Sequence, residues 1–254
     1  MYTVRPQIIS LLLERGANIQ QLGFGNSTLL YILVYSFRRA DTPMDFEACV
    51  HLLTQHGLKW NTLNRNRNTP FGLAIRRRFP VETLRLMIRC GADVNQVGHQ
   101  DETALHLLFR REVTRDIDVP HVLEIAHFLL NEQGISIQQL NEVGGNVLFR
   151  VSRKERNVPQ IMTFLIESGI DINLISQSGK TAFQQAAHKK QFIQAVVNSG
   201  RLFEFNHHLC GELFKSSLLR MKCIVFMLWM MHSPYYSGRT ILCTDMFRHL
   251  CTFL

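Results

Sequence analysis

Short apolar segments alternate with polar stretches along the chain, and the apolar segments are of two kinds. Segments of the first kind are amphipathic and end at a glycine: ISLLLERG, CVHLLTQHG, LRLMIRCG, AHFLLNEQG and MTFLIESG. A glycine directly after a helix supplies the left-handed backbone that closes the helix C-terminus. Segments of the second kind, such as PFGLAI, ALHLLF and AFQQAA, follow a threonine whose hydroxyl can cap a helix N-terminus. The pattern therefore predicts pairs of helices joined by short polar connections.

The distance from each of these glycines to the next capping residue is constant. It is twelve positions in Gly16–Thr28, Gly57–Thr69, Gly91–Thr103, Gly134–Asn146 and Gly169–Thr181. The glycines themselves recur after 41, 34, 43, 35 and 31 residues, the last interval ending at Gly200, which is a spacing typical of repeat proteins. The part of the repeat from the glycine to the cap is thus fixed in length, and the part from the cap to the next glycine tolerates insertion. We expect the insertions at RRADTPMDFEA and REVTRDIDVPHVLE, between the two helices of alternate repeats.

The motifs at these positions resemble the ankyrin repeat. They are GADVN at 91–95, TPFGLA at 69–74 and TALHLL at 103–108, with the variants GANIQ at 16–20 and GIDIN at 169–173. The resemblance covers roughly residues 5 to 205 and implies an all-α solenoid of about five to six helix-turn-helix units. We expect an array over residues 1–206 whose first repeat lacks its opening helix, and a degenerate helical cap over 207–254.

Composition narrows the class of protein. Apolar residues make up 46% of the 254 positions and charged residues 19%, as in folded chains. The longest apolar run, CIVFMLWMM at 223–231, is shorter than the roughly 20 residues of a membrane span, and MYTVRPQIISLLLERG does not read as a secretory signal. Six cysteines without a CxxC pair are typical of reduced thiols in the cytosol or nucleus. The net charge of +8 favours acidic partners.

The resemblance to ankyrin repeats also implies where a partner protein binds, which is a concave groove formed by loop tips and the inner short helices. Positions seven and eight after each cap belong to this groove, and in four repeats they form a basic ladder: Arg76, Arg77, Arg110, Arg111, Arg153, Lys154, His188 and Lys189. With Arg65 and Arg67 of the loop LNRNRN, the basic ladder predicts an acidic partner segment. Phe24 and Tyr35 are candidate apolar anchors at one end. The alternative is that these cations are solvated and only complement helix dipoles.

The last fifty residues support a second hypothesis. Leu219, Cys223 and Met227 are spaced four apart, so they share one face of a helix. This spacing resembles the elongin-binding helix of a SOCS box, and ILCTDMFRHLCTFL at 241–254 lies where a cullin-binding segment is expected. The resemblance implies a substrate receptor of a cullin–elongin ubiquitin ligase. Leu218, Met227 and Thr244 depart from the usual pattern.

We find no sequence signature of an enzyme. GFGN at 23–26 lacks the third glycine of a nucleotide-binding loop, and no nucleophile motif is present. His207, His208 and Cys210 lack a fourth ligand nearby, so no metal or cofactor is expected. Nucleic-acid binding by the basic ladder remains an alternative, although aromatic side chains do not interleave with its arginines. The sequence therefore favours a non-enzymatic protein-binding scaffold or adaptor, and a purely structural role stays open.

Overall fold

The computed structural model describes residues 5–37, 43–110, 118–153, 159–186 and 189–199. They belong to one compact unit that ends at Glu204. Within these ranges the chain forms helices and no strand, apart from the isolated bridges Gly23–Ser27 and Ile175–Thr181. The boundary expected at 206 and the predicted docking residues Leu219, Cys223 and Met227 lie outside the described residues.

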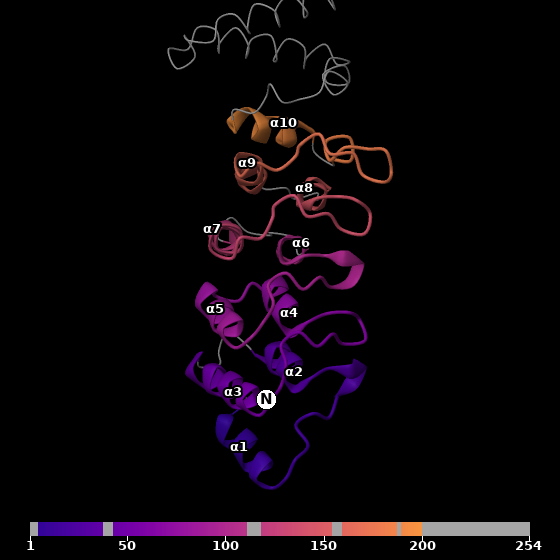
Figure 1. Cartoon of the computed structure of the whole chain (residues 1–254). Helices are drawn as coiled ribbons and strands as arrows, with labels where there is room; N and C mark the ends of the chain where they lie inside the picture. The colour runs from indigo at the N-terminus through magenta and orange to yellow at the C-terminus, as the bar shows by residue number, and fades with distance from the viewer. Residues whose placement is uncertain (1–4, 38–42, 111–117, 154–158, 187–188, 200–254) are drawn as a thin grey trace, which may run out of the picture. The chain divides into compact units, whose positions relative to one another are not determined.

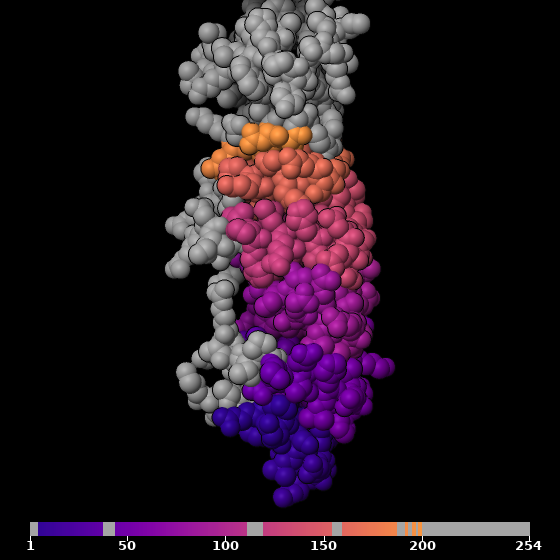
Figure 2. All heavy atoms as spheres, turned by 90° about the vertical axis from the view of Figure 1, so that its left-hand side faces the viewer, coloured from indigo at the N-terminus to yellow at the C-terminus, as the bar shows by residue number. Residues whose placement is uncertain are grey.

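The helices stand in two columns, with loops projecting beyond one of them (Figure 1). The outer helices are α1 (Pro6–Glu14), α3 (Pro43–Gln55), α5 (Val81–Arg89), α7 (Asp118–His127), α9 (Pro159–Glu167) and α10 (Lys189–Asn198). The inner helices are α2 (Leu29–Ser36), α4 (Pro70–Arg76), α6 (Ala104–Leu108) and α8 (Val147–Ser152). Figure 2 views the face of the outer helices, where successive repeats follow one another as bands. The predicted all-α solenoid is confirmed.

The predicted glycine stops are confirmed at every repeat. Gly16, Gly57, Gly91, Gly134 and Gly169 all have positive φ values, between 65° and 96°. At Gly91 the amide donates to the Ile88 carbonyl at 2.9 Å, and the Ala92 amide donates to Met87 at 3.0 Å. These two bonds form a Schellman motif, which satisfies carbonyls that the end of α5 leaves open.

The fourth glycine stop, Gly134, is preceded by a π-helical turn and not by a regular α-helical end. Helix α7 continues into a π-helical turn, Phe128–Glu132, before Gly134. The Ile135 amide donates to Leu129, six residues back, whereas the Ala92 amide donates to Met87, five residues back. The π-helical turn therefore absorbs one extra residue, as such turns do elsewhere, and the interval from Gly134 to Asn146 stays at twelve.

The predicted N-caps are present in most repeats. The side-chain oxygens of Thr28, Thr69 and Asn146 accept from amides of the first helical turn. Thr103 is an exception, because its hydroxyl contacts the His106 ring at 2.9 Å and makes no capping bond. After Thr181 the predicted helix is reduced to a single turn over 182–185.

The two segments expected to contain the insertions are partly helical. Helix α3 already begins at Pro43 and α7 at Asp118, so the second half of each quoted segment is helical. Proline suits the first turn of a helix, since that turn needs no amide donor.

A finger projects between each outer helix and the next inner helix. Every finger tip is closed by the same backbone bond, in which the first residue donates to the fifth at 2.8–3.0 Å. The tips are 23–27, 64–68, 98–102, 141–145 and 176–180. Three pairs of neighbouring tips are also joined, because the amides of Arg65, Glu142 and Gln177 donate to the carbonyls of Gly25, Gln100 and Val143. Backbone bonds therefore fix each tip, and they join the first tip to the second and the third to the fourth and fifth.

The core is a continuous seam between the two columns. It contains Trp60, Phe128 and Phe183, each almost fully buried, and the inner helices of successive repeats contact one another, α2 with α4 and α4 with α6. A Cβ added at Gly72 on α4 would meet Leu107 of α6 at 3.0 Å, so the inner helices lie in close contact there. Helix α1 buries none of its residues and exposes Ile8, Leu11 and Leu12. No helix among the described residues combines the length and apolar character needed to cross a membrane.

Candidate protein-interaction surface

We define the inner face as the surface formed by the five finger tips and the C-terminal ends of α2, α4, α6 and α8. The constant glycine-to-cap interval gives each finger the same length, so equivalent positions of successive repeats lie in rows. Two rows bear the predicted binding residues. One follows the finger tips and the other follows the ends of the inner helices.

The row of tips changes in chemistry from repeat to repeat. Phe24, at the first tip, is fully exposed (101%), so it does not pack inside the array. The second tip exposes Arg65 and Arg67, whereas the third exposes Asp101 and the fourth Glu142. The first four tips thus expose an aromatic ring, then positive charge, then negative charge, and the fifth exposes Lys180.

The side chain of Arg77 contacts the preceding repeat, whereas the basic ladder predicts that it faces a partner. Its Nη1 donates to the carbonyls of Val34 (3.0 Å) and Tyr35, and its Nη2 donates to Phe37 at 3.2 Å. These carbonyls belong to the end of α2, where backbone acceptors lack helical partners. Arg77 therefore closes the inner helix of the preceding repeat. Tyr35, in contact with Arg77, is 67% exposed.

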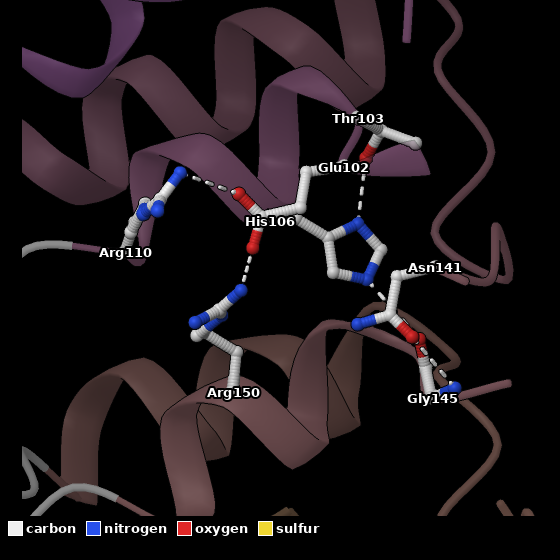
Figure 3. Close-up of polar contacts among 7 residues, drawn as sticks. All are labelled: Glu102, Thr103, His106, Arg110, Asn141, Gly145 and Arg150. Carbon is white, nitrogen blue, oxygen red and sulfur yellow. Dashed lines mark hydrogen bonds and ion pairs between the residues drawn. The ribbon is translucent and has the colours of Figure 1, made fainter. Parts of the chain in front are cut away.

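Arg110 also has a partner within the array. Its Nη1 lies 3.2 Å from Oε2 of Glu102, whose side chain is 0% exposed, and Arg150 on α8 forms an ion pair with the other oxygen (Figure 3). The side chains of Arg110 and Arg150 are 37% and 29% exposed. One buried carboxylate therefore joins guanidinium groups of two successive repeats.

Sequence reasoning missed Glu102 and Arg150, although one signal was available. Arg150 lies four positions after its cap, where the three preceding repeats have Ile32, Leu73 and Leu107. Leu73 and Leu107 are buried. An arginine in an otherwise apolar row needs a buried acid, and Glu102 is that acid. Burial, and then the charge of Arg153, lower the pKa of Arg150 from its ordinary value.

His106 links the third and fourth repeats beside this ion pair (Figure 3). Its Nε2 lies 3.2 Å from the Gly145 carbonyl, and its Nδ1 lies 2.9 Å from the Thr103 hydroxyl. Since a carbonyl can only accept, Nε2 carries the hydrogen and Nδ1 accepts from Thr103. Burial lowers the pKa of His106 below 6.5, opposed by the bond to Gly145. The ring is therefore a neutral structural link.

The other members of the basic ladder are placed as follows. Arg76 ends α4 and is partly exposed, and Arg153 is exposed directly after α8. Lys189 begins α10. Arg111, Lys154 and His188 lie outside the described residues, as do His207, His208 and Cys210. The described residues contain no cluster of three or more His, Cys, Asp or Glu that could hold a metal ion.

Comparison with known proteins identifies the fold. No family model matches the chain, and no curated protein matches its sequence. Among solved structures, an ankyrin repeat domain from Acinetobacter baumannii superposes with a TM-score of 0.57 at 20% identity, covering 77% of this chain and 92% of that one. The fold is thus that of an ankyrin repeat domain.

A second solved structure gives a similar result. It is that of a predatory endopeptidase from Bdellovibrio bacteriovorus in complex with an immunity protein, and a chain in it matches with a TM-score of 0.52. The identity is 17%, and the match covers 77% of this chain and 91% of that one.

Proposed function

We propose that the protein is a non-enzymatic scaffold or adaptor that binds an acidic segment of another protein along its inner face. The observation that carries the proposal is the row of finger tips, which backbone bonds order before any partner arrives. A preformed surface loses little conformational freedom on binding. The endopeptidase–immunity protein complex supports the proposal by showing the matched fold within a protein–protein assembly.

The expected partner chemistry follows from the cations on the inner face. Arg65 and Arg67 are exposed on one tip, and Arg76 lies partly exposed at the end of the neighbouring inner helix. Such a patch selects negatively charged segments and speeds their association. Phe24 and Tyr35 add exposed aromatic surface near this patch, and aromatic residues are frequent anchors in interfaces.

The test is a selection from an unbiased displayed peptide library against the full chain. We expect acidic peptides, whose affinity falls as salt rises. Reversal of Arg65, Arg67 and Arg76 to glutamate should abolish binding. The matched control reverses three arginines, Arg5, Arg15 and Arg89, that are exposed around the outer helices. Equal affinity for the inner-face variant and the wild type would overturn the proposal.

A second proposal rests on the sequence of residues 207–254, which resembles a SOCS box. In that case the array would select a substrate, and Leu219 and Cys223 would dock on elongin. Purified elongin complex and a cullin supply a direct test by co-elution with the full chain. Co-elution that is lost on Leu219→Asp and Cys223→Asp supports the ligase role, and no co-elution rejects it.

A further inference from the structure

The buried ion pair of the third and fourth repeats has an uneven charge. Glu102 is the last residue of the third finger tip, directly before Thr103, and it lies between Arg110 and Arg150 (Figure 3). One carboxylate faces two guanidinium groups, so the group as a whole is positive. A buried carboxylate is stable only with such partners, and it restricts the conformations of both arginines.

Both arginines remain partly exposed, one just after the end of α6 and the other on α8. Their side chains are 37% and 29% exposed, while the carboxylate between them is completely covered. The acid is thus on the inside of the cluster and the cations are on the outside. This arrangement differs from a surface salt bridge, where both partners are solvated and contribute little.

Arg153 extends the positive cluster. It is exposed directly after α8, one turn beyond Arg150, and its charge is a cause of the lowered pKa of Arg150. Glu102 therefore pairs with two arginines, and a third arginine lies one helical turn beyond the second. Neighbouring like charges are unfavourable by themselves, so an additional anion at this place would be stabilised by all three.

We propose that Arg110, Arg150 and Arg153, positioned by Glu102, form an oxyanion subsite that takes one carboxylate or phosphate group of the polypeptide bound on the inner face. The inference rests on the proposed scaffold function and assigns it a specific contact. A guanidinium group presents donors in a fork that matches carboxylate and phosphate oxygens. Ordering by Glu102 lowers the entropy lost when the anion binds.

The neighbouring finger tips restrict what the oxyanion subsite accepts. Asp101 and Glu142 are exposed on the tips of the same two repeats. A continuous run of acidic residues across these tips would meet like charge. The oxyanion subsite therefore suits a single acidic or phosphorylated residue that reaches past the tips.

The test uses inorganic phosphate and acetate as probes on the full chain at constant ionic strength. We expect the Nε–H signals of the three arginines to shift saturably in ¹⁵N NMR spectra, at millimolar concentrations. The charge-neutral variant Glu102→Gln/Arg150→Leu should weaken binding at least five-fold, and Arg153→Gln, at an exposed position, should weaken it several-fold without affecting folding. Arg89→Gln is the control on an outer helix. Tighter binding of phosphate indicates a phosphorylated residue, and comparable binding of acetate indicates a carboxylate.

Three results would overturn the oxyanion subsite: no saturable shift, an equal shift at Arg89, or unchanged affinity in Glu102→Gln/Arg150→Leu. Any of them would leave the scaffold proposal standing if reversal of Arg65, Arg67 and Arg76 still abolished peptide binding. Binding of phosphate with no effect of that reversal would instead separate the oxyanion subsite from the proposed acidic groove.

Discussion

The guanidinium of Arg77 lies 5.8 Å from the ring centroid of Tyr35, and it joins the ends of two neighbouring inner helices. The same guanidinium donates to the carbonyls of Val34 and Phe37. Arg77, which we expected to face a partner, thus bonds to the neighbouring repeat of the array. Its charge also neutralises the negative end of the α2 dipole.

We expect Arg77→Met to lower the free energy of unfolding by about 1–3 kcal/mol, because acceptors at the end of α2 lose a charged donor. Methionine retains most of the apolar stem. Arg76→Met, one residue earlier, is the control and should change stability by less than about 0.5 kcal/mol. Urea unfolding followed by circular dichroism measures both. Equal effects of the two variants would show that the bonds to α2 contribute nothing.

The Glu102 ion pair should respond asymmetrically to mutation. Glu102→Gln leaves arginines that can turn to solvent, so we expect a loss of about 1–2 kcal/mol. Arg110→Gln/Arg150→Gln leaves a buried carboxylate unpaired, which costs about 3–5 kcal/mol. Urea unfolding midpoints at equal m-values give the comparison. A larger loss in Glu102→Gln would contradict the assignment of Glu102 as the desolvated member.

His106 should make stability depend on pH. Burial lowers its pKa in the folded state below the usual 6.5, so the unfolded chain binds the proton more readily. Its contribution is therefore complete above about pH 6.5 and decreases as the pH falls below that value. We expect His106→Gln to reduce this dependence, measured as the difference from wild type in urea unfolding between pH 7.5 and 5.

Glutamine is the matched replacement at His106 because Gln184 occupies the equivalent position in the fifth repeat. There Gln184 and Thr181 exchange hydrogen bonds of 2.9 and 3.3 Å. The variant can therefore keep a contact with Thr103. An unchanged pH dependence in His106→Gln would assign the effect to other histidines.

Cys49 should be chemically inert in the folded protein. Burial, and then the nearby Asp45 carboxylate, raise its pKa to about 11. Since the thiolate is the reactive form, iodoacetamide at pH 8 should modify Cys49 only on unfolding. Peptide mass spectrometry with and without urea reports the rate. Cys90, which is less buried, is the internal reference and should react faster; modification of Cys49 at the Cys90 rate would contradict the prediction.

Much of the fold could be predicted because its determinants are local. A glycine such as Gly91 needs its left-handed conformation whatever packs around it, and the cap at Thr69 bonds only three residues ahead. The length of each finger follows from the same local signals. The single turn after Thr181 was missed because helix length depends on packing as well as on caps.

The candidate surface was less predictable because its decisive contacts are distant in sequence. Arg77 bonds to residues about forty positions earlier, and Arg150 pairs with an acid in the preceding repeat. The position of a residue within its repeat indicates where the side chain leaves the backbone, but it does not indicate which distant group the side chain contacts. The basic ladder therefore stays a prediction, and the internal partners of Arg77 and Arg110 emerged only from the structure.

The π-helical turn Phe128–Glu132 has a consequence for how such a protein can change over evolutionary time. It takes up a surplus residue on the outer column, ahead of Gly134, and the finger that follows keeps its length. The extra residue in the outer column therefore does not shift the finger tip that follows it. The length of an outer helix can therefore change in evolution while the spacing of the finger tips, along which we propose that a polypeptide binds, is preserved.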